Sequence, residues 1–356
     1  MNKLLLRITL IGLALAVVGI AAANVGCGIG RQCVFLPIVT TPTQLAPTAT
    51  ATTQPVAPTA TLNPQPNVIV GLAILGDSTQ DEYRADNPRG GEYNATTLNW
   101  VELLATVRKL NLGPWGQREE PRRGGYAFNW ARSGATSDQM LSNGQHTGAA
   151  AQAVAGLVSH AIVQIGINDF YFSGLGQQIY LGTASGDALR ARLDLIADNI
   201  ISAARALKAT GQCEVLVAAT QDYMTLPIVP ELYVEYQDPV GRQRFVDAIA
   251  YLNQRLAQLG AEEGVAFFDF NAAYLAEVQS RLDAEGFLIV GGERVDLRKR
   301  GNEPHFGLID DGYIHPGTVL SGLYAKLYIE AFNRSFGTAI APLSDDDILR
   351  AAGIKP

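Results

Sequence analysis

The sequence has few cysteines and few histidines for its 356 residues. The three cysteines are Cys27, Cys33 and Cys213, and this spacing matches neither a disulfide framework nor a metal-ligand motif. We therefore predict that Cys213 is a small buried apolar residue. Histidine, the usual general base of an enzyme, occurs at only four positions, which are His146, His160, His305 and His315.

Acidic residues are absent from the first 66 residues, which contain only Lys3, Arg7 and Arg31 as charged side chains. The rest of the chain has 24 basic and 34 acidic residues, a net charge of −10. A body this acidic is a poor partner for nucleic acid. We therefore predict no nucleic-acid partner.

The N-terminus has the features of an export signal. Lys3 and Arg7 precede an uncharged apolar run, Ile8–Ala23, that ends in small residues. The run is slightly short for a membrane span, so residues 1–26 are either a cleaved signal peptide or a retained membrane anchor that engages the membrane or the export machinery. Gly26-Cys27 resembles a lipoprotein cleavage site, which makes lipidation at Cys27 an alternative. We predict an extracellular or cell-surface location.

The next segment lacks the residues that form a core. Thr40–Pro66 contains nine Thr, six Pro and five Ala among its 27 residues, with no charge and no aromatic ring. Such a composition favours an extended spacer. We predict a linker over residues 27–66, a folded catalytic domain over 67–342 and a surface tail over 343–356.

The body alternates short apolar runs with helical periodicity. Runs typical of buried parallel strands are 68–75, 161–165, 215–219 and 265–269, and helical segments are 99–111, 189–210 and 242–263. This alternation predicts an α/β fold, a three-layer α/β/α sandwich with a mainly parallel sheet. Ligands of such folds bind beyond the carboxyl ends of the strands.

Polar residues that could carry chemistry follow these runs. Gly76-Asp77-Ser78 follows the first run, Gly166-Ile167-Asn168-Asp169 follows the second, and Asn129–Ser137 (NWARSGATS) lies between them. His315-Pro316 lies near the C-terminus. A serine that attacks a carbonyl needs a base and donors for the oxyanion, and these segments offer each part.

These four blocks, in this order, resemble those of the SGNH (GDSL-type) hydrolase superfamily, which has a flavodoxin-like fold. The resemblance spans about residues 68–336. It implies that Ser78 is the nucleophile and His315 its base. It also implies an oxyanion hole formed by the backbone N–H groups of Ser78 and Gly134 and the side-chain amide of Asn168.

The sequence departs from the family at the acid that orients the histidine. The family usually has Asp three residues before the histidine, and here that position is Gly312. Asp311 is our candidate for this role, and a backbone carbonyl is the alternative. His305 is a competing candidate for the base, although a surface-loop histidine is the simpler interpretation.

Three aromatic residues near the blocks, Trp130, Phe170 and Tyr171, are candidate substrate-binding residues, although Phe170 and Tyr171 could instead pack beneath the insertion 174–187. No cofactor and no metal are required. The resemblance implies a serine ester hydrolase acting on a lipid or aryl ester or on an O-acetylated carbohydrate. The alternative is a non-catalytic carbohydrate-binding or adhesive module on a degenerate hydrolase scaffold, motivated by the glycine at position 312 together with the N-terminal tether. Flavin binding has only the fold analogy in its favour.

Overall fold

The computed structural model describes residues 65–356 except residues 86, 172, 226–228 and 230–235. The predicted export segment, and all but the last two residues of the predicted linker, lie outside this described part. Within it, no helix combines the length and the apolar character needed to cross a bilayer.

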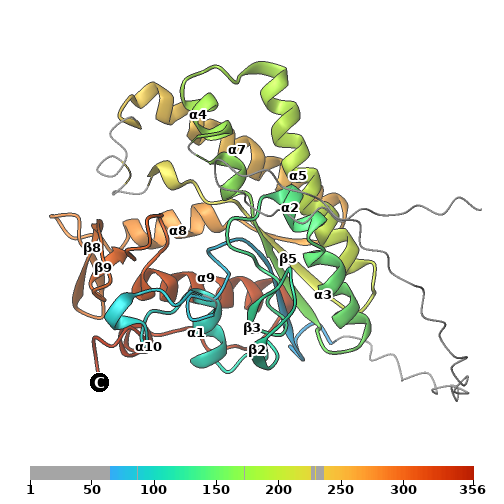
Figure 1. The fold of residues 1–356 in the computed structure, drawn as a ribbon, viewed down its shortest axis with the longest axis horizontal. Coiled ribbons are helices and arrows are strands. Elements are labelled where there is room, and N and C mark those ends of the chain that lie inside the picture. The colour runs from blue at the N-terminus through green and yellow to red at the C-terminus, as the bar shows by residue number, and fades with distance from the viewer. Residues whose placement is uncertain (1–64, 86, 172, 226–228, 230–235) are drawn as a thin grey trace, which may run out of the picture. The chain divides into compact units, whose positions relative to one another are not determined.

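A parallel sheet forms the centre of the fold (Figure 1). Its strands lie in the order β1-β4-β5-β6, and they are β1 (Leu72–Gly76), β4 (His160–Gln164), β5 (Glu214–Ala218) and β6 (Ala266–Phe268). Every neighbouring pair is parallel, and β1 and β4 are buried along their whole length. Strands covered on both faces have continuous apolar sequences, which is why the four apolar runs predicted them.

The segment 128–132 extends the sheet beyond β1. Ile74 N–H donates to the Phe128 carbonyl, and the Ile74 carbonyl accepts from Trp130 N–H at 2.8 Å. Arg132 N–H donates to the Gly76 carbonyl at 3.1 Å. Because this segment runs parallel to β1, the residues that follow Arg132 reach the same edge of the sheet as the residues that follow Gly76.

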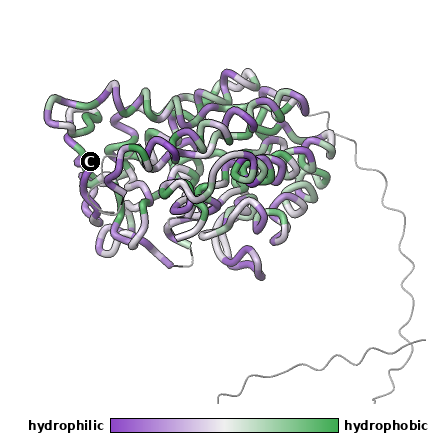
Figure 2. Tube along the Cα trace, turned by 90° about the horizontal axis from the view of Figure 1, so that it is seen from above, coloured by the Kyte–Doolittle hydropathy of each residue, from purple (hydrophilic) through white to green (hydrophobic). Residues whose placement is uncertain are grey.

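Helices cover both faces of the sheet. On one face α3 (Gln145–Val154), α5 (Gly186–Lys208) and α7 (Pro239–Glu262) pack in sequence against one another and against the strands. The other layer contains α1 (Trp100–Thr106), α8 (Phe270–Gln279) and α9 (Thr318–Phe336), and both α1 and α8 pack on α9. This is the predicted three-layer sandwich. In Figure 2 hydrophobic and hydrophilic stretches alternate along the tube, as expected of helices with one buried face.

The remaining described elements are short. They are η1 (Gly91–Tyr93), β2 (Trp115–Gln117), β3 (Gly124–Tyr126), α2 (Ser137–Ser142), η2 (Ile167–Phe170), α4 (Leu175–Tyr180), η3 (Tyr223–Thr225), β7 (Leu288–Val290), β8 (Glu293–Arg300), β9 (Phe306–Leu308) and α10 (Asp345–Ala351).

The prediction that residues 343–356 form a surface tail is wrong. Ser344 caps α10 through a capping box with Asp347, and the apolar side of the helix carries Ile348 and Leu349, which are fully buried. Asp347 also pairs with Arg108 at 2.5 Å. The segment therefore packs on α9 as part of the folded body.

Candidate active site

Three chain segments bring polar groups to one edge of the sheet. Ser78 follows β1 in a turn, and Asn168 lies in η2, directly after β4. Gly134 follows the segment 128–132 that runs beside β1. Because neighbouring parallel strands end at the same edge, these three residues come together although they are up to 90 positions apart in sequence.

A cavity opens at this edge and has two lobes. The first, which we call the apolar lobe, has a volume of about 240 Å³. The second, the polar lobe, has a volume of about 360 Å³. Both lobes are lined by Ser78, Asn168, Tyr171, Tyr313 and His315.

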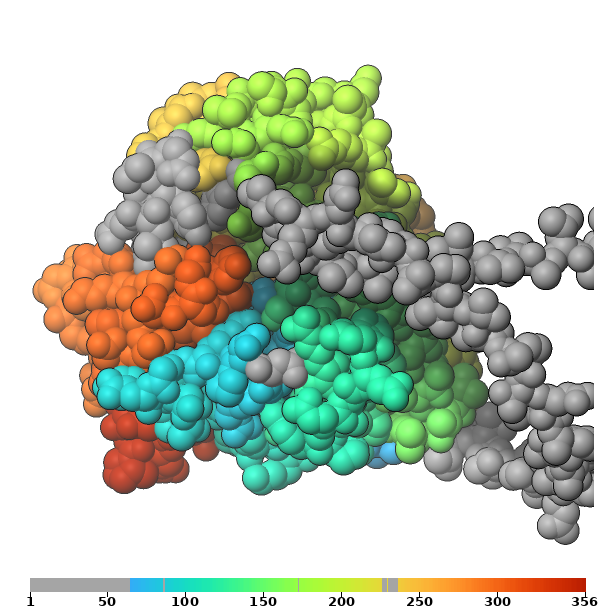
Figure 3. Space-filling model, in the orientation of Figure 1, coloured from blue at the N-terminus to red at the C-terminus, as the bar shows by residue number. Residues whose placement is uncertain are grey.

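The two lobes differ in the side chains that line only one of them. Ile167, Tyr223 and Ile314 line only the apolar lobe, together with Thr79, Ser173 and Gly312. Arg89, Ser133 and Gly134 line the polar lobe. In Figure 3 a recess lies on this face where the orange surface of the later chain meets the cyan and teal surface of residues near 90–140. Ser78 therefore lies where the apolar lobe and the polar lobe meet.

His315 lies 6% exposed at the wall of both lobes, paired with Asp311. Its Nδ1 is 2.5 Å from Asp311 Oδ2. The second oxygen of Asp311 accepts a hydrogen bond from Tyr313 N–H at 3.1 Å, which fixes the carboxylate from the other side. The structure thus brings Asp311, the residue predicted from sequence, against His315.

The loop that carries this pair is closed by backbone contacts. Leu308, the last residue of β9, bridges to Pro316, and Ile309 N–H donates to the His315 carbonyl at 3.1 Å. Gly312 has a φ of +84°, a conformation in which side chains are strained. Gly312 therefore makes the turn that brings Asp311, one residue earlier, beside the imidazole.

Burial and neighbouring charges set the protonation of this pair. Burial lowers the pKa of His315 below its ordinary value, opposed by the hydrogen bond that His315 donates to Asp311 and assisted by the positive charge of Arg89. Burial alone would raise the pKa of Asp311, but its hydrogen bond and charge interaction with His315 and the charge of Arg89 together bring it below the ordinary value. The geometry therefore holds a neutral imidazole beside a carboxylate at neutral pH.

Asn168 and Gly134 have the properties of oxyanion donors. One N–H of the Asn168 amide donates to the Ala135 carbonyl at 3.0 Å, which fixes the amide plane. The amide has a second N–H that can donate to an oxyanion. Gly134 is exposed, with a φ of +81° and open space where a Cβ would stand. A residue with a side chain there would be strained and would narrow the approach to its N–H.

The carboxylates beside these groups hold loops. Asp77, 2% exposed, accepts from the N–H and hydroxyl of Thr79, and burial raises its pKa to about 7. Asp169 accepts from the N–H and hydroxyl of Ser137 at the start of α2. This contact gives Asp169 a structural role, because it ties η2 to the start of α2.

Arg89 is a residue of the cavity wall that the sequence did not indicate. Its Nε lies 3.6 Å from Asp311 Oδ2, and its Nη2 donates to Ser133 Oγ at 3.2 Å. No motif marks this arginine, because it lies in a loop whose path is set by tertiary contacts.

Two of the three candidate substrate-binding residues do not line the cavity. Trp130 lies beneath Arg122, with 4.2 Å between the guanidinium and the ring centre, and its Nε1 donates to Gln152. Phe170 is fully buried and packs edge-on against Phe245 in the core. The structure therefore places neither ring in the lining of the two lobes. Tyr171 lines both lobes and is 51% exposed.

The other histidines lie away from the cavity lining. His305 is an exposed loop residue 3.6 Å from Glu293, as the simpler interpretation predicted. His146 is half-buried on α3, whereas His160 is fully buried in β4. Cys213 is buried, as predicted.

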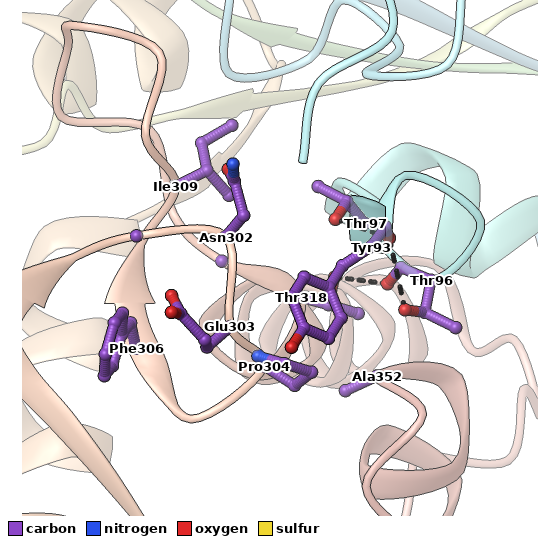
Figure 4. Close-up of a pocket in the computed structure, with 12 residues that line it drawn as sticks. Tyr93, Thr96, Thr97, Asn302, Glu303, Pro304, Phe306, Ile309, Thr318 and Ala352 are labelled. Carbon is purple, nitrogen blue, oxygen red and sulfur yellow. Dashed lines mark hydrogen bonds between the residues drawn. The ribbon is translucent and has the colours of Figure 1, made fainter. Parts of the chain in front are cut away.

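A separate hollow lies between the loop near residue 95 and the loop 301–306, where Thr318 donates to the Thr96 carbonyl (Figure 4). Its volume of about 10 Å³ holds no more than a water molecule. Among the described residues, no group of three or more His, Cys, Asp or Glu side chains could hold a metal ion.

Comparison with known families now identifies the chain. The sequence model of the GDSL-like Lipase/Acylhydrolase family matches residues 74–318, which include the Ser78, Gly134, Asn168 and His315 segments. The chain belongs to this family. As a GDSL-like acylhydrolase it is a carboxylic ester hydrolase with the flavodoxin-like fold of that group. Asp311 lies beside His315, so the glycine at position 312 does not leave the imidazole without a carboxylate neighbour.

Several solved structures are similar to this GDSL-like hydrolase. An acetylxylan esterase from Geobacillus stearothermophilus is 16% identical, with 74% of this chain and 93% of that chain covered and a TM-score of 0.41. A phospholipase A1 from Streptomyces albidoflavus is 16% identical, with coverages of 75% and 99% and a TM-score of 0.41. A lipase from a goat rumen metagenome is 11% identical, with coverages of 73% and 96% and a TM-score of 0.43. No curated protein sequence matches the chain.

Proposed function

We propose that this GDSL-like hydrolase is an exported serine esterase that works through an acyl-enzyme on Ser78. In this proposal His315 is the base, Asp311 orients it, and Ser78 N–H, Gly134 N–H and the Asn168 amide form the oxyanion hole. The observation that carries the proposal is the cavity at the sheet edge, whose walls bring Ser78, Gly134 and Asn168 together with the His315–Asp311 pair.

The first half-reaction follows from the protonation of the pair. The contact with Asp311 occupies His315 Nδ1, so Nε2 is the nitrogen left to accept a proton. Ser78 Oγ attacks the ester carbonyl carbon as its proton moves to Nε2, and the carbonyl oxygen becomes an oxyanion stabilised by the three donors. The tetrahedral intermediate then breaks its bond to the alcohol oxygen, which takes the proton from Nε2.

The second half-reaction repeats these steps with water. His315 removes a proton from a water molecule, whose oxygen attacks the acyl carbon. When the bond to Ser78 Oγ breaks, the serine regains a proton and the carboxylic acid leaves. In both half-reactions the carboxylate of Asp311 stabilises the imidazolium that forms when Nε2 accepts a proton.

The two lobes support an assignment of the two sides of the ester. Ile167, Tyr223 and Ile314 make the apolar lobe suited to the acyl chain, since each buried methylene contributes about 0.8 kcal/mol. The polar lobe, with Ser133 and Arg89, suits the alcohol side. The size of the apolar lobe favours an acyl chain longer than acetyl.

An O-acetylated carbohydrate is the second candidate substrate. It is favoured by Tyr171 and Tyr313, which line both lobes and are 51% and 56% exposed. Exposed rings with an apolar face and a polar edge suit a sugar of a larger polymer. An acetyl group would leave most of the apolar lobe empty.

The proposed location rests on the sequence alone. The basic and apolar segment 1–26 and the Thr/Pro-rich segment 27–66 support export followed by a spacer. Retention of the anchor, or a lipid on Cys27, would tether the hydrolase at the cell surface. Labelling of intact cells with a membrane-impermeant reagent, compared with a cytoplasmic marker, tests this placement.

Activity of the full-length chain on p-nitrophenyl esters from acetate to decanoate tests the reaction and the acyl assignment together. We expect the kcat/KM to rise beyond acetate to an optimum at an intermediate chain length, and Ser78→Ala to abolish it. Ile314→Trp, which narrows the apolar lobe, should move the optimum to shorter chains. Ser142→Ala, an exposed serine on α2, is the matched control and should leave both unchanged. An optimum at acetate, together with activity on acetylated xylan, would favour the carbohydrate candidate.

A further inference from the structure

Arg89 contacts three parts of the active site that come from three separate chain segments. Its Nε is 3.6 Å from Asp311 Oδ2, its Nη1 is 3.5 Å from the Ser78 carbonyl oxygen, and its Nη2 donates to Ser133 Oγ at 3.2 Å. Ser133 directly precedes Gly134. One side chain therefore lies against the residue beside the base, the turn of the nucleophile and the turn of an oxyanion donor.

We propose that Arg89 is a positioning residue that holds these three segments in register for catalysis. The proposal rests on the proposed function, in which Ser78, Gly134 and the His315–Asp311 pair act together.

Arginine suits this place because its planar group presents donors in several fixed directions. The guanidinium lies 4.5 Å from the centre of the Tyr83 ring. Tyr83 is fully buried, and its hydroxyl donates to the Pro316 carbonyl at 3.1 Å. The arginine thus has a rigid surface beneath it, and only 15% of its side chain is exposed. A lysine would keep the charge but could reach these acceptors with only one nitrogen.

Ser133 is held from two sides, which makes the contact with Arg89 more than incidental. Its N–H donates to Asp81 Oδ2 at 2.8 Å, while its hydroxyl accepts from Arg89. Asp81 and Arg89 therefore fix the residue before Gly134, and with it the direction of the Gly134 N–H.

Charges from two loops face His315. Asp311 and Asp81 are negative and Arg89 is positive, and the rings of Tyr83 and Tyr313 lie beside the imidazole. The positive charge of Arg89 opposes protonation of His315, whereas both carboxylates favour it. Loss of the Arg89 charge should therefore raise the pKa of His315, so that the base is protonated and inactive up to a higher pH.

The experiment compares the full-length chain with Arg89→Gln, Arg89→Lys and the control Arg190→Gln, an exposed arginine on α5. The kcat and KM for p-nitrophenyl butyrate are measured from pH 4 to 9, with thermal unfolding as the check of folding. We expect Arg89→Gln to lower kcat by about tenfold or more and to move the acidic limb of kcat/KM to higher pH. Arg89→Lys should keep the acidic limb but have a reduced kcat, and the control should match the wild type.

Three results would overturn the proposal. The first is wild-type kcat and an unmoved acidic limb in folded Arg89→Gln. The second is a raised KM with kcat and limb unchanged, which would make Arg89 a substrate-binding residue. The third applies if Arg89→Gln does not fold. In that case a wild-type kcat in Arg89→Lys would overturn the proposal, since lysine keeps the charge and loses only the several donors of the guanidinium. Wild-type hydrolysis by Ser78→Ala would instead refute the proposed function itself, whatever the Arg89 variants do.

Discussion

The replacement Asp311→Asn tests the pairing of Asp311 with His315 without changing the shape of the side chain. In the structure one carboxylate oxygen accepts from Tyr313 N–H at 3.1 Å, and the other lies 2.5 Å from His315 Nδ1. An asparagine has one oxygen, and Tyr313 N–H needs an acceptor. The amide oxygen should therefore face Tyr313, and the amide NH₂ should face His315.

This arrangement would reverse the tautomer of the neutral imidazole. With an NH₂ donor facing it, Nδ1 must be the acceptor, so the proton of the neutral ring moves to Nε2. A protonated Nε2 cannot accept the proton of Ser78. We expect kcat to fall by about 10³- to 10⁴-fold, the loss typical of a wrong tautomer in a serine triad. Asp311→Ala, which leaves the ring free to choose its tautomer, should lose no more than Asp311→Asn.

The assay is steady-state hydrolysis of p-nitrophenyl butyrate by the full-length chain at pH 7.5. Asp310→Asn is the matched control, because Asp310 is the exposed neighbour and does not contact the imidazole. A kcat for Asp311→Asn within tenfold of the wild type would refute the reasoning. It would mean that another group, such as the backbone carbonyl considered from the sequence, orients His315.

Four other expectations follow from the same contacts. Asn168→Ala should lower kcat by about 10²- to 10³-fold with little change in KM, measured with the same ester, and an unchanged kcat would exclude its amide from the oxyanion hole. The acidic limb of kcat/KM should have its midpoint below 6.5, the ordinary value of histidine, because burial lowers the pKa of His315 and keeps the base neutral at lower pH. Burial raises the pKa of Glu82 to about 8, so the wild type should lose stability relative to Glu82→Gln as the pH rises from 4.5 to 8. Urea unfolding of both proteins at pH 5 and 8.5 measures this, and an equal difference in unfolding free energy at the two pH values would contradict it. Leu349→Ala should cost about 2–5 kcal/mol of unfolding free energy, whereas a surface tail would lose less than about 0.5.

The sheet and the positions of the site residues at its edge could be predicted from the sequence. Strands buried on both faces require unbroken apolar runs, and polar residues directly after such runs must lie at one edge. The segment 128–132 is different, because it joins the sheet beside β1 with only an isolated bridge and lacks a long apolar run. Gly134 could therefore be placed at the site only through the resemblance.

The partner of His315 could be predicted only as a candidate. The loop 309–315 is closed by the Leu308–Pro316 bridge, and its turn at Gly312 depends on backbone angles that spacing does not reveal. Arg89 was missed for a similar reason, because nothing in its local sequence indicates the path of its loop. The surroundings of the Trp130 and Phe170 rings depend on their packing partners, Arg122 and Phe245, and Phe245 is distant from Phe170 in sequence.

The docking of α10 did have a signal in the sequence. Ser344 and Asp347 have the spacing of a helix cap, and Ile348 and Leu349 follow as apolar residues on one side of the helix. An amphipathic helix with two adjacent large apolar residues needs a surface to cover it. The three consecutive aspartates in its first turn add to this signal, because acidic residues stabilise a helix N-terminus.

The most direct test of the central claim is covalent labelling of the full-length chain by a fluorophosphonate, followed by mass spectrometry of its peptides. The account predicts one label per chain, on Ser78, with loss of esterase activity in proportion to labelling and slower labelling in His315→Ala. Two results would contradict Ser78 as the nucleophile. The first is full labelling at another residue with the esterase activity retained, and the second is a folded chain that hydrolyses esters but takes no label on Ser78.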